Sequence, residues 1–252
     1  MNFPHSLSEL VTLVNAVIWI AASLGPDIAS AQQPDTLWTQ TFGGPGSESC
    51  FLGQETSDSG FILGGHTSSL GAGGYDMYMV KTDSMGTLVW ETTFGGPLWD
   101  DCRSIQQTDD GGYILAGYTT SFGAGDSDMY LVKTDSLGNL VWQRTFGGAL
   151  ADDCYFVRQT PDGGYILCGY TRSFANGPMD FYLVRTDQQG IMEWERVFGG
   201  VEDERGHCVR LTADGGYILA GFSSTYGAGG RDIYVVKTDA SGNWVWDNTT
   251  EG

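Results

Sequence analysis

Acidic side chains offer most of the chemistry in this sequence, because they recur at matching places in four successive segments of the chain. Carboxylate oxygens that converge on one point suit Ca²⁺, which takes about 6 to 8 oxygen ligands at roughly 2.3 to 2.6 Å. The candidate metal ligands are Asp100, Asp101, Asp152, Asp153 and Asp203. No DxDxDG spacing of the EF-hand type accompanies them. A solvated acidic rim is therefore the alternative, and calcium is the only cofactor that the pattern suggests.

Aromatic residues among glycines and acids form a second candidate site. They are Trp99, Tyr155, Phe174 and Tyr226. Exposed aromatic rings beside carboxylates can stack on sugar rings, so this set predicts ligand binding with a glycan as one candidate ligand. The alternative is that the rings pack on neighbouring parts of the fold.

The histidines form no recognisable catalytic pair. His66 and His207 lie at non-equivalent positions, and no Ser/His/Asp or Cys/His motif accompanies them. A hydrogen-bonded structural histidine is the simpler interpretation. We therefore expect no catalytic residue and no enzymatic activity.

Five cysteines cannot all pair within one chain. Cys50, Cys102 and Cys154 are equivalent residues of successive segments, which favours a small buried apolar residue reused by duplication. Cys154 and Cys168 fall on neighbouring expected strands, where a disulfide would need a suitable Cα separation that the sequence does not establish. No CxxC spacing indicates a zinc or redox site.

Charge excludes one class of partner. The chain has 252 residues with 31 acids and 12 bases, for a formal net charge of −19, and no Lys/Arg cluster occurs. A phosphate-binding surface needs a basic patch, so nucleic acid is not expected as a partner.

Residues 1–31 differ from the rest of the chain and predict a signal peptide. An apolar stretch from Leu10 to Gly25 is followed by Ala29, Ser30 and Ala31, an Ala-x-Ala cleavage site. A membrane anchor is the alternative, although about 16 mostly apolar residues are fewer than the roughly 20 that a spanning helix needs. We expect a secreted or cell-surface protein with no stable membrane insertion after cleavage.

A repeat of 52 residues organises residues 32–252. Nothing is inserted or deleted over four units, and the matching positions are Phe42, Phe94, Phe146 and Phe198; Asp58, Asp110, Asp162 and Asp214; Asp76, Asp128, Asp180 and Asp232; Asp83, Asp135, Asp187 and Asp239; and Trp38, Trp90, Trp142, Trp194 and Trp246. Such constant spacing indicates duplication of one structural unit.

One unit resolves into four short strands. We expect them at about 102–108, 113–119, 129–134 and 140–146, with an Asp-Gly hairpin turn after the first. The second strand, YILAGYT, is apolar on both faces, so its sheet must be covered on both sides. The recurring turn aspartates cap their own backbone and need no ligand.

Four antiparallel strands in each repeat of about 50 residues predict an all-β fold, a β-propeller of four four-stranded blades. The expected blades are residues 47–95, 99–147, 151–199 and 203–250, and the Trp and Phe of each fourth strand would pack between adjacent blades. A β-solenoid is the alternative, but four hairpin-spaced strands in each coil fit it poorly.

The repeat unit, WxxTFGG followed by TxDGGYILAGYT and DxYLVKTDxxGNxxW, resembles a repetitive β-propeller family of secreted and cell-surface proteins of bacteria and archaea. This resemblance covers residues 36–252 and implies a fold rather than an activity. The turn with Asp135, Gly138 and Trp142 is also similar, though one residue shorter, to that of quinoprotein propellers. That likeness implies that these residues dock one blade on the next, and it does not extend to the quinone cofactor.

Both ends of the repeat region offer a fourth-type strand. The N-terminal copy, residues 37–42, keeps Phe42, whereas the C-terminal copy has Thr250 and Glu251 where the other units have Phe and Gly. Either the two copies compete for the outer edge of the last blade in a closed four-bladed ring, or the chain is a fragment of a longer propeller. The loss of the motif favours the second interpretation.

These patterns favour an exported, non-enzymatic propeller that serves as a binding or scaffolding module for an extracellular protein or a glycan. The alternatives are a propeller-fold carbohydrate-active enzyme and a structural or adhesion segment of a larger surface protein.

Overall fold

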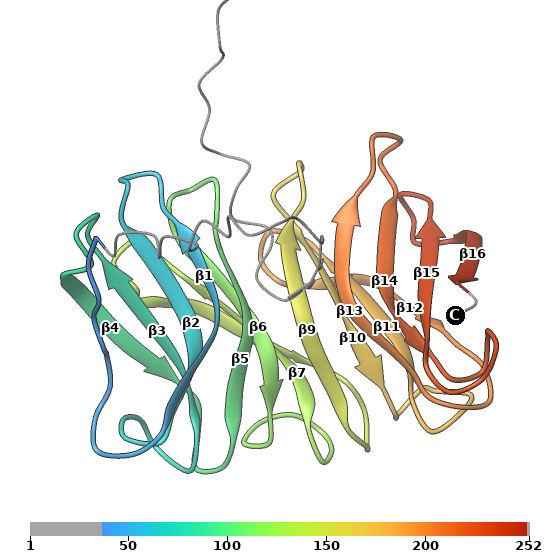
Figure 1. Cartoon of the computed structure of the whole chain (residues 1–252), viewed down its shortest axis with the longest axis horizontal. Coiled ribbons are helices and arrows are strands. Elements are labelled where there is room, and N and C mark those ends of the chain that lie inside the picture. The colour runs from blue at the N-terminus through green and yellow to red at the C-terminus, as the bar shows by residue number, and fades with distance from the viewer. Residues whose placement is uncertain (1–36, 251–252) are drawn as a thin grey trace, which may run out of the picture. The chain divides into compact units, whose positions relative to one another are not determined.

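The computed structural model describes residues 37–250, so the predicted signal peptide at 1–31 lies outside the described residues. Residues 40–250 belong to one compact unit made of strands (Figure 1). The first sheet contains β1 (Glu48–Glu55), β2 (Phe61–Thr67), β3 (Asp76–Thr82) and β4 (Leu88–Phe94). The second contains β5 (Asp100–Gln107), β6 (Tyr113–Thr119), β7 (Asp128–Thr134) and β8 (Leu140–Phe146). The third contains β9 (Asp152–Gln159), β10 (Tyr165–Thr171), β11 (Asp180–Thr186) and β12 (Met192–Phe198), and the fourth contains β13 (Glu204–Leu211), β14 (Tyr217–Ser223), β15 (Asp232–Thr238) and β16 (Trp244–Thr250).

Each sheet is an antiparallel meander in which the four strands pair in chain order. The predicted strands at 113–119 and 140–146 are confirmed, and the first strand of that unit begins two residues before the prediction, at Asp100. Gly111 adopts a φ of 79° in the turn between β5 and β6, which explains why this place requires glycine. No helix among residues 37–250 is long and apolar enough to cross a membrane.

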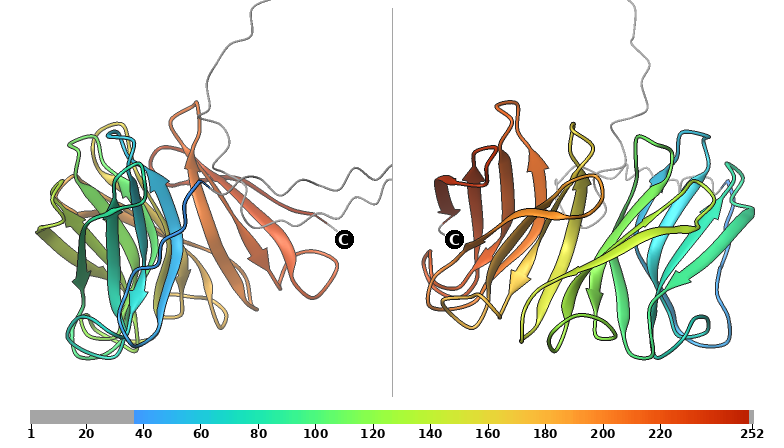
Figure 2. Two further views of the ribbon diagram at one scale, coloured as in Figure 1. Left: turned by 60° about the vertical axis from the view of Figure 1, so that its left-hand side comes forward. Right: turned by 180° about the vertical axis from the view of Figure 1, so that it is seen from behind.

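The sheets stack face to face as the blades of a β-propeller, and successive sheets lie side by side in chain order (Figure 2). Their contacts concentrate on the first strands β1, β5, β9 and β13, which are therefore innermost. Three apolar cores fill the junctions between neighbouring sheets; the core between the second and third sheets includes Ile114, Leu131, Phe146, Val157 and Leu167. Burying both faces of a sheet explains why YILAGYT is apolar throughout.

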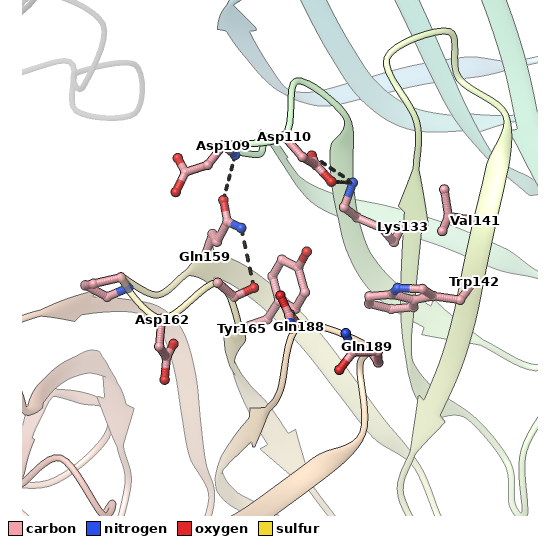
Figure 3. A pocket seen from close by; sticks show the side chains of 12 residues that line it. Asp109, Asp110, Lys133, Val141, Trp142, Gln159, Asp162, Tyr165, Gln188 and Gln189 are labelled. Atoms are coloured by element: carbon pink, nitrogen blue, oxygen red, sulfur yellow. Dashed lines mark hydrogen bonds and ion pairs between the residues drawn. The ribbon is translucent and has the colours of Figure 1, made fainter.

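Each junction is also fixed by a tryptophan that docks under the next sheet. Trp142 lies so close to the β11–β12 turn that a Cβ added at Gly190 would be 2.7 Å from its ring. Gly138 meets Trp90 in the same way, and Trp142 packs edge-on against Tyr165 (Figure 3). The geometry therefore agrees with the docking role inferred for Gly138 and Trp142.

The row of sheets is an arc in the described part of the chain, with the first and fourth sheets at opposite ends (Figures 1 and 2). Ile233 on the fourth sheet is 58% exposed, whereas its counterpart Phe181 is fully buried by that sheet. The predicted strand at 37–42 is wrong, because residues 37–44 form no strand. A fourth-type strand must pair with a third strand, and β16 already occupies the edge of β15.

Candidate functional site

The repeated turn aspartates have structural roles, as predicted. Asp135 accepts hydrogen bonds from the backbone N–H groups of Leu137 and Asn139 at 2.8 and 2.9 Å. Asp110 accepts one from Gly112 and also pairs with the buried ammonium of Lys133 at 2.9 Å. The sequence did not indicate this ion pair, which recurs in every sheet.

The acids that open the first strands are mostly buried. Asp100 accepts hydrogen bonds from the hydroxyls of Thr119 and Ser121 and from the N–H of Gly96. Asp152 has the same partners one repeat later, so these carboxylates hold the loops of their own sheets rather than lining an open rim.

The other predicted metal ligands point to different partners. Asp101 bonds to His66 and Arg103, Asp153 accepts hydrogen bonds from Ser127 and Tyr170, and the carbonyl of Asp203 accepts from Ser224. No three His, Cys, Asp or Glu side chains within residues 37–250 are grouped to hold a metal ion. Calcium binding therefore stays a prediction without a site in the described residues.

A β-bulge in every first strand presents a side chain that is different in each of the four sheets. The bulged residues are Phe51, Arg103, Tyr155 and His207, which occupy the same repeat position. The glycine opposite each bulge is required, since a Cβ at Gly117 would lie 1.7 Å from the carbonyl oxygen of Asp101. Bulges re-aim side chains next to functional sites, and here they place four chemically different groups on the innermost strands.

A cavity of about 200 Å³ lies beside the bulge at Arg103, lined by His66, Tyr75, Trp99, Asp101, Arg103 and Tyr118. His66 Nδ1 is 3.0 Å from Asp101, and Arg103 donates to the other carboxylate oxygen at 2.8 Å. The guanidinium of Arg103 also lies 4.4 Å from the centre of the Phe51 ring. The cavity thus combines a fixed carboxylate, a guanidinium and an imidazole with aromatic walls.

Trp99 forms the exposed wall of this cavity. Trp99 is 56% exposed and its ring packs edge-on against Tyr75, whose ring in turn lies 4.6 Å from that of His66. The backbone holds this wall in place, because Tyr75 and Trp99 form a bridge between neighbouring sheets and Asp100 N–H donates to Tyr75.

A second aromatic and cationic cluster surrounds the bulges of the third and fourth sheets. Arg205 donates to the Tyr155 hydroxyl at 3.2 Å, and its guanidinium lies 4.8 Å from the Tyr170 ring centre. The rings of Tyr155 and His207 are 5.2 Å apart. Burial raises the pKa of Asp153, which accepts hydrogen bonds from the hydroxyls of Ser127 and Tyr170.

Two of the four predicted ligand-binding aromatics lie elsewhere. Phe174 packs on Tyr182, and Tyr226 packs on Tyr234 and donates to the carbonyl of Gly199. Phe122 packs on Tyr130 in the same way. The three loop rings therefore pack against a tyrosine of their own sheet. Trp99 and Tyr155 lie in the two clusters described above.

Within residues 37–250, neither His66 nor His207 is hydrogen bonded to a hydroxyl or thiol nucleophile. Within the described residues, no hydroxyl or thiol hydrogen bonds to His66, whose partners are Asp101 and the rings of Phe51 and Tyr75. All five cysteines are free thiols, and complete burial raises the pKa of Cys154 to about 12. The buried thiols of Cys102, Cys154 and Cys168 are consequently packing groups.

Larger clefts open between sheets at the turn side. One of about 560 Å³ is lined by Lys133, Trp142, Gln159 and Tyr165 (Figure 3), and an equivalent cleft of about 510 Å³ lies one junction further. Each cleft is lined by a docking tryptophan and the tyrosine it packs on, Trp142 with Tyr165 and Trp194 with Tyr217. The clefts are therefore a repeated consequence of the way the sheets stack.

Comparisons with known proteins find similarity to a curated protein and to solved structures. No family model matches the chain. It is 24% identical over 182 residues to the regulatory protein FlaEY of Caulobacter vibrioides, and the match covers 63% of this chain and 19% of that protein. Among solved structures, the WD40 domain of Pan2 from Neurospora crassa matches 79% of this chain and 51% of that chain at 12% identity, with a TM-score of 0.47. Sqt1 from Chaetomium thermophilum matches 76% of this chain and 44% of that chain at 14% identity, with a TM-score of 0.41.

Proposed function

We propose that this protein is an exported, non-enzymatic binding module that acts at the cell surface or outside the cell, with the cavity beside Trp99 as its binding site. The partner is a protein or a glycan that inserts one ring-sized group into the cavity. A propeller fold is consistent with a binding or scaffolding role, and export is inferred from the N-terminal sequence.

The observation that carries this proposal is the departure from the repeat at the cavity. Turn positions such as that of Asp110 hold the same residue in all four sheets, whereas Trp99, Arg103 and His66 have no identical counterpart in any other sheet. A volume of about 200 Å³ is smaller than the usual 300 to 1,000 Å³ of sites that enclose a whole ligand, so it suits one group of a larger partner.

The chemistry of the lining matches recognition rather than catalysis. Trp99 and Tyr75 offer aromatic surface, and Asp101 and Arg103 offer a fixed acceptor and a fixed donor. Aromatic residues and arginine are enriched among the residues that dominate binding energies, because they supply large contact area with directional polar groups.

Binding to defined oligosaccharides on an array and to purified extracellular proteins tests this function. The Trp99→Ala and Arg103→Gln variants should weaken binding at least 10-fold. Trp244→Ala serves as the matched control, because Trp244 is 58% exposed but lies on an outer strand. Equal binding by all variants would remove the cavity from the proposal. Turnover of a polysaccharide that His66→Ala or His207→Ala abolishes would instead establish an enzyme.

A further inference from the structure

One polar position on the first strands joins the first sheet to the second and the second sheet to the third. The side-chain oxygen of Gln54 accepts a hydrogen bond from the backbone N–H of Gln107 at 3.1 Å. One repeat later, the side-chain oxygen of Gln106 accepts from the N–H of Gln159 at 2.9 Å. The first and second junctions therefore share the same glutamine bridge.

The third junction lacks this bridge because Arg158 occupies the glutamine position. An arginine side chain has no acceptor atom. The N–H of Leu211, which stands where Gln107 and Gln159 stand in the other junctions, consequently meets no glutamine oxygen. The next unit has arginine again at this position, Arg210 on β13.

The two arginines gather around one aromatic ring. The guanidinium carbons of Arg158 and Arg210 lie 5.3 and 4.4 Å from the centre of the Phe156 ring. Neither side chain has a carboxylate ion-pair partner within residues 37–250. The Nε of Arg158 is buried without a hydrogen-bond partner, and Nη1 of Arg210 donates to the carbonyl of Val209.

This arrangement costs free energy as it stands. Burial lowers the pKa of Arg158, and the charge of Arg210 lowers it further. Like charges in a partly buried place repel each other more strongly than in water, and an unpartnered buried donor adds its own penalty. The chain has 31 acidic residues, yet the described residues place none of them in an ion pair with either guanidinium.

We propose that Arg158, Arg210 and the N–H of Leu211 bind an oxyanion, whose oxygen takes the place of the glutamine oxygen found at the other two junctions. Carboxylate, sulfate and phosphate share the required chemistry, since each offers oxygens to the N–H donors of guanidinium groups. The site lies near the ends of β9 and β13 that are remote from Asp101 and Trp99, and it is independent of the proposed binding cavity.

Titration of the full chain with sodium phosphate, sodium sulfate and sodium succinate tests this site, at ionic strength held constant with sodium chloride. We expect a saturable rise in the melting temperature and a dissociation constant measurable by calorimetry for at least one of the three. The anion that saturates identifies the source as phosphate, sulfate or carboxylate. Arg158→Gln and Arg210→Gln should each weaken that binding at least 10-fold.

The melting temperature of anion-free Arg158→Gln separates loss of the anion site from loss of folding. The substitution restores the glutamine of the repeat, so the anion-free variant should melt at the same temperature as the wild type or higher. Arg172→Gln is the control, because Arg172 is exposed and donates to Pro178 away from the site. The proposal fails if no anion saturates the wild type, if both variants bind as the wild type does, or if anion-free Arg158→Gln melts at a lower temperature.

Discussion

Asp180 and Glu204 bring two carboxylates together at the junction of the third and fourth sheets. Oxygens of both lie around Gly199, and Oδ1 of Asp180 is buried without a hydrogen-bond partner. Burial, followed by the charge of Glu204, raises the pKa of Asp180 to about 6, from 3.8 in a solvated aspartate. Because the folded pKa is the higher one, this group favours the folded state below about pH 3.8, and its contribution is lost as the pH rises through 6.

Asp180→Asn should therefore stabilise the protein at pH 8 by about 1 to 3 kcal/mol, since one pKa unit corresponds to about 1.4 kcal/mol. The amide keeps an oxygen for the N–H of Asn176 and removes the second charge. Thermal melts at pH 8 and pH 4 measure the effect, which should shrink at the lower pH. Glu202→Gln, an exposed change on the preceding loop, is the control. An equal shift for Asp180→Asn at both pH values would contradict the prediction.

Single residues divide into those that the repeat preserves and those that break it. The preserved turn acids, such as Asp135, are used by backbone partners, so the sequence pattern identified their role correctly. Asp100, predicted as a metal ligand, is instead held by backbone and hydroxyl partners. The residues that break the repeat, such as Arg103 and Arg158, lie on the innermost strands. Comparison between repeats was therefore the pattern that could have located both candidate sites.

At the level of strands, periodic apolar residues and Asp-Gly turns predicted most of the boundaries. The β-bulges were not predictable from the sequence. Arg103 is bulged only because it has no partner on β6, and its residue type does not reveal this. The predicted strand at 37–42 failed for a related reason. Its sequence matches β4 and β8, but a strand forms only where an edge is free to pair with it.

The docking tryptophans allow the contribution of one junction to be measured. Trp142 is partly buried against the core between the second and third sheets, whereas its counterpart Trp246 on β16 is 44% exposed. Trp142→Ala should lower the free energy of unfolding by about 2 to 4 kcal/mol, because it removes a large side chain that is packed on a neighbouring sheet. Trp246→Ala should cost under about 1 kcal/mol. Urea denaturation of both variants measures the difference, and similar losses would mean that docking adds little to stability.

The molecule as a whole carries a large excess of negative charge. With 31 acids and 12 bases, the compact state suffers more self-repulsion than the extended chain. Four of the basic side chains already form ion pairs with turn aspartates, so few remain to balance the other acids. These four are Lys81, Lys133, Arg185 and Lys237. This charge distribution makes the stability of the fold sensitive to ionic strength.

Raising sodium chloride from 10 mM to 0.5 M at pH 7.5 should raise the melting temperature by several degrees. Salt shortens the screening length from about 30 Å at 0.01 M to under 10 Å, which weakens repulsion between distant carboxylates. The four repeated ion pairs, each between an exposed carboxylate and a buried cation, oppose this trend, but the repulsions among the excess acids outnumber them. The same titration near the isoelectric point of about 4.1 is the control, since repulsion is then nearly absent. An equal salt effect at both pH values would assign the stabilisation to salt exclusion from the surface instead of charge screening.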